Sequence, residues 1–378
     1  MPPITLNGDT GIQTPMYNGT ITANAVTPSV NMKNRIINGA MVIDQRNAGA
    51  SVTATTAYPY TLDRWQCGGS QNSKFTVQQS SVAPTGFVNS SLITSSSAYT
   101  VGAGENFVFF QNIEGFNTAD LGWGTADAKT VTLSFWVRSS LTGTFGGSIQ
   151  NSATNRSYPF TYTINAANTW EYETITIAGD TSGTWLTTNG TGVIVRFGLG
   201  VGSTFSGTAG SWSGSNFLSA TGATSVVGTN GATWYVTGVQ LEVGSTATSF
   251  DYRPYGTELA LCQRYCYQAL GRDVGATGSD WGGCGLSVLS TFQLTPILIP
   301  VTMRSASGQS ITLTSSVGNY FALNGSGSAV TATAVVLDTP STRCPVIGVT
   351  VASGLTAGQA GSLYVSNSSN KLFITSEL

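Results

Sequence analysis

Residues Lys129–Ser140, KTVTLSFWVRSS, alternate between apolar side chains and larger or polar ones. One face of the extended chain carries Val131, Leu133, Phe135 and Val137, and the other carries Thr132, Ser134, Trp136 and Arg138. A period of two residues is typical of a β-strand whose one face is buried. This stretch therefore predicts a strand that covers a core.

Similar strands recur on both sides of this one. We expect them at Trp170–Ile177, Gly192–Gly200 and Thr233–Val243, separated by turns rich in Gly, Ser and Asn such as Gly179–Gly183 and Thr187–Gly192. Several strands at this spacing predict an antiparallel sandwich, most simply a jelly roll of two facing sheets. We assign residues 35–256 to it.

A helix and a second β module are expected after the sandwich. Thr257–Leu270, TELALCQRYCYQAL, has an apolar stripe, with Thr257 as a candidate cap and Glu258 in the first turn. We interpret residues 257–271 as a connector helix. Residues 272–378 form a smaller β module with candidate strands Ser310–Leu313, Ala329–Val336, Ile347–Val351 and Lys371–Thr375. The predicted fold class is thus all-β, a jelly-roll sandwich followed by one helix and a second module.

The first residues, 1–34, contain several prolines and glycines and no clear periodicity. Such a segment is either a flexible arm or one that becomes ordered on a partner. Because it precedes a compact domain, we interpret it as an attachment arm. It lacks the basic start and apolar stretch of a signal peptide, which favours assembly in the cytoplasm.

Charge is scarce in this chain. Asp, Glu, Lys and Arg make up 8% of the 378 residues, against roughly 25% in an average globular protein. The 15 basic residues form no cluster that could neutralise phosphates, so nucleic-acid binding is not expected. No apolar run reaches the roughly 20 residues of a membrane span.

The residue types also limit the kinds of catalytic and metal site that this chain can form. With no histidine, Ser-His-Asp and Cys-His catalysis and histidine metal centres are excluded. Five cysteines at irregular spacing argue against a disulfide framework. Cys262 and Cys266, four residues apart, could suggest half of a metal site, but we expect them to be small buried apolar residues. A glycan depolymerase needs two carboxylates, and Glu171 and Glu173 share one strand face about 7 Å apart. Exposed acids on a strand are usually solvated, and we expect no enzyme.

Several segments carry a family resemblance. NRIINGAMVIDQRN (Asn34–Asn47), YTLDRW (Tyr60–Trp65), SFWVRSS (Ser134–Ser140), WEYETITIAGDTSGTW (Trp170–Trp185) and WYVTGVQLEVGSTATSFDYRPYGTELALCQRYCYQ (Trp234–Gln268) resemble a domain of bacteriophage tail-fibre and other virion proteins. The resemblance implies a jelly roll of the carbohydrate-binding-module type and a phage appendage that is usually homotrimeric. On such a particle we expect the attachment arm, residues 1–34, to contact other virion proteins. It leaves tail and capsid locations open.

Tryptophans in Gly-rich loops are the sequence's candidates for sugar contact. Trp123, Trp212 and Trp281 could stack on a sugar ring, with Asp120, Asp127 and Asp280 as nearby hydrogen-bonding groups. Buried loop anchors are the alternative interpretation. Jelly rolls of this type often carry a structural calcium, but no dense acidic loop marks one, so no cofactor or metal is assigned.

Three functions follow from these observations. The first is a homotrimeric tail appendage of the virion that contacts host-surface glycans, where three copies strengthen weak binding. The second is a capsid head fibre or decoration protein, and the third is a glycan depolymerase. The C-terminal module suits either a trimer clasp or a receptor-binding tip.

Overall fold

The computed structural model describes residues 32–271, 280–365 and 369–378. By its internal contacts the chain separates into residues 1–33 and a unit that spans Asn34–Leu378. The predicted attachment arm falls almost wholly outside the described residues. No helix of the described residues is long and apolar enough to cross a membrane.

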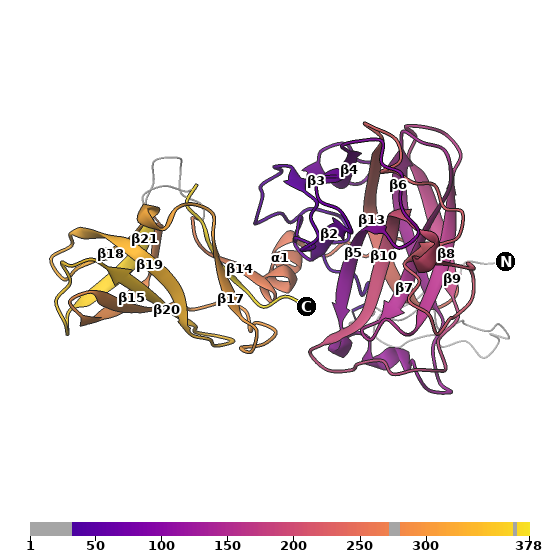
Figure 1. Cartoon of the computed structure of the whole chain (residues 1–378). Helices are drawn as coiled ribbons and strands as arrows, with labels where there is room; N and C mark the ends of the chain where they lie inside the picture. Colours follow the sequence, from indigo (N-terminus) through magenta and orange to yellow (C-terminus); the bar gives the residue numbers. More distant parts are fainter. Residues whose placement is uncertain (1–31, 272–279, 366–368) are drawn as a thin grey trace, which may run out of the picture. The chain divides into compact units, whose positions relative to one another are not determined.

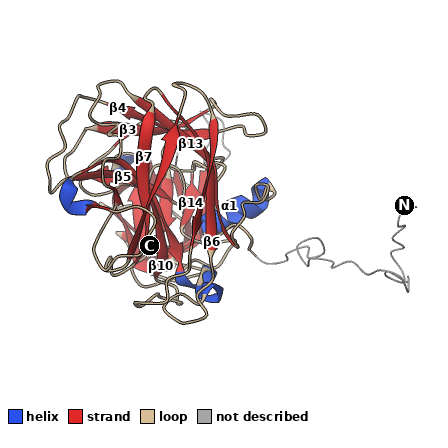
Figure 2. Ribbon diagram, turned by 90° about the vertical axis from the view of Figure 1, so that its right-hand side faces the viewer, coloured by secondary structure: helices blue, strands red, loops and turns tan. Residues whose placement is uncertain are grey.

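The N-terminal part of the larger unit is a sandwich of two antiparallel sheets (Figures 1 and 2). The first sheet has six strands in the order β1 (Val52–Thr53), β3 (Phe75–Ser80), β4 (Ser90–Ser95), β13 (Thr233–Val243), β6 (Val131–Ser139) and β9 (Glu171–Ile177). The second has five, in the order β2 (Trp65–Gly69), β5 (Asn106–Glu114), β10 (Thr191–Val201), β7 (Gly143–Asn151) and β8 (Ser157–Ile164). Several neighbouring strands, such as β4 and β13 or β5 and β10, are far apart in sequence, and the two facing antiparallel sheets confirm the predicted jelly-roll sandwich.

Short elements complete this part. The parallel pair β11 (Ser206–Gly207) and β12 (Ser219–Ala220) lies in the loop after β10. Three short 3₁₀ turns are η2 (Gly115–Asn117), η3 (Ala119–Leu121) and η4 (Ser203–Phe205).

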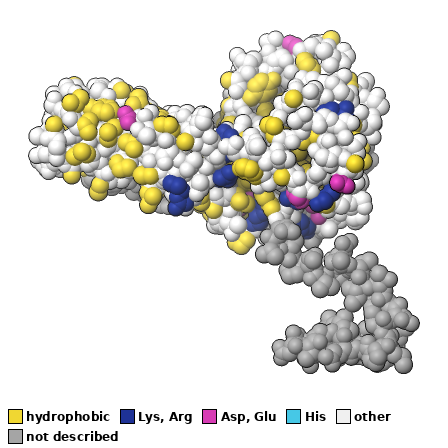
Figure 3. Space-filling view, turned by 90° about the horizontal axis from the view of Figure 1, so that it is seen from below, with side chains coloured by type: hydrophobic (Ala, Val, Ile, Leu, Met, Phe, Trp, Pro, Cys, Tyr) yellow, Lys and Arg dark blue, Asp and Glu magenta, His cyan; other side chains and the backbone are white. Residues whose placement is uncertain are grey.

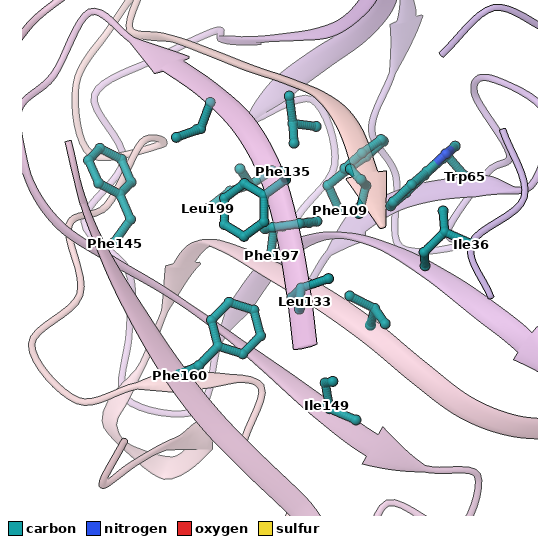
Figure 4. Close-up of a cluster of buried hydrophobic side chains, with 14 of the residues drawn as sticks. Ile36, Trp65, Phe109, Leu133, Phe135, Phe145, Ile149, Phe160, Phe197 and Leu199 are labelled. Atoms are coloured by element: carbon teal, nitrogen blue, oxygen red, sulfur yellow. The ribbon is translucent and has the colours of Figure 1, made fainter. Parts of the chain in front are cut away.

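Aromatic side chains from both sheets fill the core between them (Figure 4). Trp65 is fully buried and stacks on Phe109, with ring centroids 4.8 Å apart and planes 6° apart. Its indole N–H donates to the Asn38 carbonyl at 3.1 Å, so its polar atom is satisfied without water. Phe197 packs edge-on against Phe135 at 5.1 Å. The alternation of the strand sequences thus produces one continuous apolar layer.

The region after the sandwich differs from the predicted connector helix. The helix α1 spans Tyr255–Gln263, so Thr257 lies inside its first turn and does not cap it. Cys266–Leu270 forms β14, which pairs with β22 (Leu372–Thr375). The prediction of helix to residue 270 was wrong because this pairing partner follows about a hundred residues later, where no local pattern can reveal it.

The C-terminal module is a small closed barrel with an accompanying sheet. Around the barrel the strands are β15 (Asp280–Leu289), β16 (Phe292–Pro296), β20 (Val346–Val351), β19 (Ala329–Thr339), β18 (Tyr320–Leu323) and β21 (Ala360–Val365). The separate sheet has the order β14, β22 and β17 (Ser310–Leu313), and a 3₁₀ turn, η5, covers Val317–Asn319. All four strands predicted from sequence for this module are present, with bounds that differ by three residues or fewer.

Buried charges join the C-terminal residues to the sandwich. Glu377 accepts from Arg46 at 2.6 Å and forms a short ion pair with Arg64, whose side chain is only 1% exposed. Arg64 also lies 3.6 Å over the Tyr265 ring. Arg253 likewise pairs with Glu258 of α1 at 3.3 Å. Breaking such pairs leaves an uncompensated buried charge.

Exposed charge is sparse on the face drawn in Figure 3, where uncharged polar side chains and backbone cover most of the area. This agrees with the 8% charged composition.

Candidate functional site

The outer face of the six-stranded sheet carries a group of aromatic side chains. Because Phe135 and Val137 of β6 are fully buried, the intervening Trp136 must point away from the core. Trp136 is in register with Tyr172 of the neighbouring strand β9, and their ring centroids lie 5.3 Å apart. Tyr172 is 43% exposed. The two rings form a partly solvent-facing platform.

Two loops carry the rings of Phe87, Phe250 and Tyr252, which form a wall beside this platform. Phe87 comes from the loop between β3 and β4, and Phe250 and Tyr252 come from the loop after β13. These three rings pack together with centroids 4.8–5.3 Å apart. The Tyr252 hydroxyl donates to the Gly86 carbonyl, which ties one loop to the other.

The platform and the wall enclose an open groove of about 470 Å³. Its described lining residues are all uncharged: Thr85, Gly86, Phe87, Ser134, Trp136, Tyr172, Gly238, Ala247, Thr248, Ser249, Phe250 and Tyr252. Partial burial raises the pKa of Tyr252, so its hydroxyl stays protonated at neutral pH. The groove therefore offers ring faces and neutral hydrogen-bonding groups. We call it the aromatic groove.

Buried polar residues of β13 fix the loop that bears the wall. Glu242, 3% exposed, accepts hydrogen bonds from the Thr248 backbone at 2.8 Å and the Thr248 hydroxyl at 2.7 Å. Gln240 donates to Glu242 at 2.8 Å, while its own oxygen accepts from the Asp251 N–H at 2.8 Å. Because the carboxylate is acceptor-only, it orients both partners. The loop is thus held in place before any ligand arrives.

Gly238 allows the wall and the platform to meet. It lies where the pairing of β13 with β6 is interrupted between Thr237 and Gln240, and its φ of +62° is left-handed. A Cβ at this position would lie 2.6 Å from the Phe87 ring and 3.2 Å from the Trp136 ring. Only glycine combines this backbone with such close rings.

A second aromatic pair continues the same face. Tyr235 of β13 is in register with Arg138, which lies two residues beyond Trp136 on β6. The Arg138 guanidinium lies 5.1 Å over the Tyr235 ring, and Trp170 packs edge-on against the same ring at 6.0 Å. Two residues of a strand span about 7 Å, so the aromatic face extends beyond the groove itself.

The tryptophans predicted from their loops lie elsewhere. Trp123 and Trp212 pack with Trp185 in a three-ring cluster, with centroids 4.7–5.5 Å apart and planes 77–80° apart. Trp123 is 7% exposed and its N–H donates to the Lys129 carbonyl at 2.8 Å. Trp212 is half-buried and donates to the Ala178 carbonyl at 2.8 Å. These contacts are those of loop anchors, and sugar contact by either residue stays a prediction.

The acidic candidates are dispersed. Asp120 pairs with Arg35 at 2.6 Å and Asp127 is exposed. Asp280 and Trp281 belong to strand β15, paired with Val365 and Tyr364, and not to the predicted loop; their side chains lie outside the described residues. No group of three or more metal-ligating side chains occurs among the described residues.

The two glutamates considered for catalysis have different environments. Glu171 accepts hydrogen bonds from Asn165 and from the Ala166 N–H, at 2.8–3.1 Å, which closes the turn between β8 and β9. These bonds lower its pKa against the opposing effect of desolvation, whereas burial and the charge of Glu171 raise the pKa of Glu173. Glu171 thus has a structural task at this turn.

Comparison with known proteins gives likenesses in structure alone. No family model matches the chain, and no curated protein does. The enzymatically active domain of tailspike protein 4 from bacteriophage CBA120 is 13% identical over 56% of this chain, with a TM-score of 0.29; the match spans 21% of that protein.

Two carbohydrate-binding modules also match. The family 11 module from Clostridium thermocellum is 10% identical, with a TM-score of 0.26 over 55% of this chain and 100% of the module. A xylan-binding domain from Paenibacillus barcinonensis is 10% identical, with a TM-score of 0.24 over 53% of this chain and 99% of the domain. At such identities and scores, no ligand can be transferred from these proteins to this chain.

Proposed function

We propose that this chain is a glycan-binding surface protein of a phage particle, and that the aromatic groove binds a neutral oligosaccharide. The observation that carries the glycan-binding proposal is the groove's composition. It presents Trp136 and Tyr172 as ring faces beside uncharged hydroxyl and backbone groups.

The chemistry of the groove suits a neutral sugar. The CH face of a pyranose packs on an aromatic ring, while its hydroxyls exchange hydrogen bonds with neutral donors and acceptors. Ser134 and Thr248 supply hydroxyls beside the rings. A charged ligand would find no opposite charge among the described lining residues. The pair Tyr235 and Trp170 on the same face would lengthen the contact for a chain of several sugars.

The preorganised wall also favours binding. Glu242 and Gln240 hold its loop, so little conformational entropy is lost when a ligand enters. A single groove of this openness gives weak binding, and several copies on one particle would raise the avidity. A homotrimer, which the sequence resemblance implies, would serve this purpose.

The phage assignment rests on the sequence segments that resemble virion appendage proteins. We propose a tail fibre as the location, a capsid fibre as the alternative, residues 1–34 as the contact to other virion proteins, and binding without catalysis. Locating the chain in cryo-EM maps of phage particles would test this part. Density on the capsid alone would contradict the tail location, and absence from particles would contradict the virion assignment.

Glycan binding is tested on the purified full chain with short neutral oligosaccharides of glucan, xylan, galactan and mannan type. We expect Trp136→Ala and Tyr172→Ala each to weaken binding about tenfold, the loss of one good ring contact. The matched control is Phe116→Ala, which removes a ring that is 60% exposed and does not line the groove. Equal binding by all variants, or no binding by the wild type at millimolar ligand, would refute the proposal.

A further inference from the structure

A second groove lies on the outer face of the five-stranded sheet, opposite to the face that carries the aromatic groove. It has a volume of about 260 Å³ and is lined by Tyr58, Asn106, Phe110, Thr154, Arg196, Phe205, Asn216 and Leu218. Unlike the aromatic groove, it contains a cation. Arg196 belongs to β10, where the fully buried Val195 and Phe197 on either side point into the core.

Arg196 is fixed at one end only. Its Nε donates to the Gln150 Oε1 at 2.6 Å, and its guanidinium carbon lies 4.5 Å over the Phe110 ring. Gln150 is fully buried, and its amide nitrogen donates to Asn216 at 2.8 Å and to the Phe217 carbonyl at 3.0 Å. These two bonds turn the Gln150 oxygen toward Arg196. The guanidinium is therefore held in one orientation.

The outer end of Arg196 has no acceptor among the described residues. Within the described ranges, no carboxylate lies within 4.0 Å of it and its two terminal nitrogens donate no hydrogen bond. Burial lowers its pKa to about 10, which still leaves it protonated at neutral pH. By contrast, Arg35, Arg46, Arg64, Arg156, Arg253 and Arg264 have carboxylate partners, and Arg304 donates to three backbone carbonyls. A half-buried cation without a counter-charge is costly and would gain from a bound anion.

The remaining lining supplies a ring platform and a second donor. Tyr58 packs edge-on against Phe110 at 6.0 Å, which gives an apolar wall. The Asn216 oxygen accepts from Gln150, and the Asn216 amide nitrogen has no acceptor in the described part of the chain. Amide and guanidinium donors beside an aromatic ring suit a ligand that carries a negative charge on a ring with an apolar face.

Two lining residues have a left-handed backbone. Tyr58 has φ +52° and Thr154 has φ +53°, although bulky and β-branched side chains disfavour this region. Asn151 holds the turn of Thr154 by accepting from the N–H groups of Asn155 and Arg156 at 3.2 and 3.1 Å. Such strain persists only where the surroundings enforce it, and it concentrates at ligand sites.

We infer that this groove, the Arg196 groove, binds an acidic saccharide through its carboxylate. The guanidinium would meet the carboxylate, Asn216 would donate to a neighbouring oxygen, and the sugar ring would lie against Tyr58. The volume is below the range of drug-sized pockets and suits a single ring. The inference does not depend on the proposed function, because it concerns different residues on the other sheet.

The test compares trigalacturonic acid with its methyl ester, which keeps the rings and loses the charge, by calorimetry on the full chain. We expect the acid to bind about ten- to a hundredfold more tightly, the range of hydrogen bonds to a charged group. Arg196→Gln should bring the acid to the affinity of the ester. Arg196→Lys should fall between, since it keeps the charge and loses the planar fork.

Two control variants show whether the acid binds at Arg196 and not elsewhere on the chain. Arg343→Gln removes an exposed arginine of the barrel module and should leave acid binding unchanged. Trp136→Ala should also leave it unchanged, and thermal unfolding of each variant checks folding. Equal binding of acid and ester, or loss of acid binding in Trp136→Ala but not in Arg196→Gln, would overturn the inference. So would inorganic sulfate binding as tightly as the acid, because the site would then recognise any anion.

Discussion

Replacing Gly238 by alanine should weaken ligand binding in the aromatic groove by more than the loss of stability of the chain would explain. The added Cβ would lie 2.6 Å from the Phe87 ring, and ordinary contact begins at 3.4 Å, so Phe87 must retreat by about 0.8 Å (3.4 − 2.6). That ring already packs against Phe250 and Tyr252. We expect a left-handed backbone cost of about 1–2 kcal/mol and an overpacking cost of about 1–3 kcal/mol.

Gly231→Ala is the matched control for this variant. Gly231 has a similar φ of +73°, but nothing lies within 4 Å of its would-be Cβ. It should show the backbone cost alone, about 1–2 kcal/mol, with the groove intact. Thermal unfolding and titration with the best neutral oligosaccharide would be measured on both variants and on the wild type.

The test compares the melting temperatures and the ligand affinities of the two variants. Gly238→Ala should unfold at a lower temperature than Gly231→Ala and should lose binding because Phe87 and Trp136 move apart. If both variants melt together and bind equally well, close ring contact at Gly238 does not shape the groove. If Gly238→Ala alone keeps full binding despite a lower melting temperature, the wall contributes no contact to the ligand.

Two further predictions concern stability and thiol access. Glu377→Gln should lower the free energy of unfolding by about 3–5 kcal/mol, because it leaves the buried Arg64 without its carboxylate partner. The control is Asp127→Asn, which changes an exposed carboxylate outside the ion pairs of the described residues and should melt like the wild type. Equal melting temperatures of the two variants would refute the role of Glu377. A thiol reagent should modify two cysteines of the folded chain and all five in denaturant, since burial raises the pKa of Cys67 to about 12 and hides its thiol. More than two fast-reacting thiols in the folded chain would contradict the core packing. The two exposed cysteines are Cys284 and Cys344, and the three buried ones are Cys67, Cys262 and Cys266.

The sandwich could be predicted because each strand buries one face. The predicted strand Thr233–Val243 coincides with β13, and Lys129–Ser140 contains β6. Residues 266–270 were assigned to a helix because Cys262 and Cys266 fit a helical stripe. They form a strand instead, since pairing with β22 supplies hydrogen bonds that the local sequence does not show. The local spacing of apolar residues thus predicts which residues are buried, whereas pairing with a distant strand determines whether the segment is a helix or a strand.

Less of the candidate site than of the fold could be predicted from the sequence. The alternation of residues 131–138 places Trp136 on the outer face of its strand, and this is the one feature of the sequence that points to the groove. Phe87 and Phe250 reach it from loops more than 160 residues apart, and no spacing rule predicts that they meet. The Gly-rich context of Trp123 and Trp212 could not distinguish an exposed ring from a buried one, because glycine also permits close packing.

Low charge content changes how each remaining charge should be interpreted. On an ordinary surface an arginine without a partner is one of many solvated groups. Here the ion pairs of the described residues engage six of the chain's eleven arginines. Arg196 is half-buried and oriented by Gln150, and no carboxylate of the described residues pairs with it. A solubilising role would leave it fully exposed, and a structural role would give its terminal nitrogens a carboxylate, as for Arg64, or backbone carbonyls, as for Arg304. The position therefore makes physical sense when an anion from outside the chain completes it.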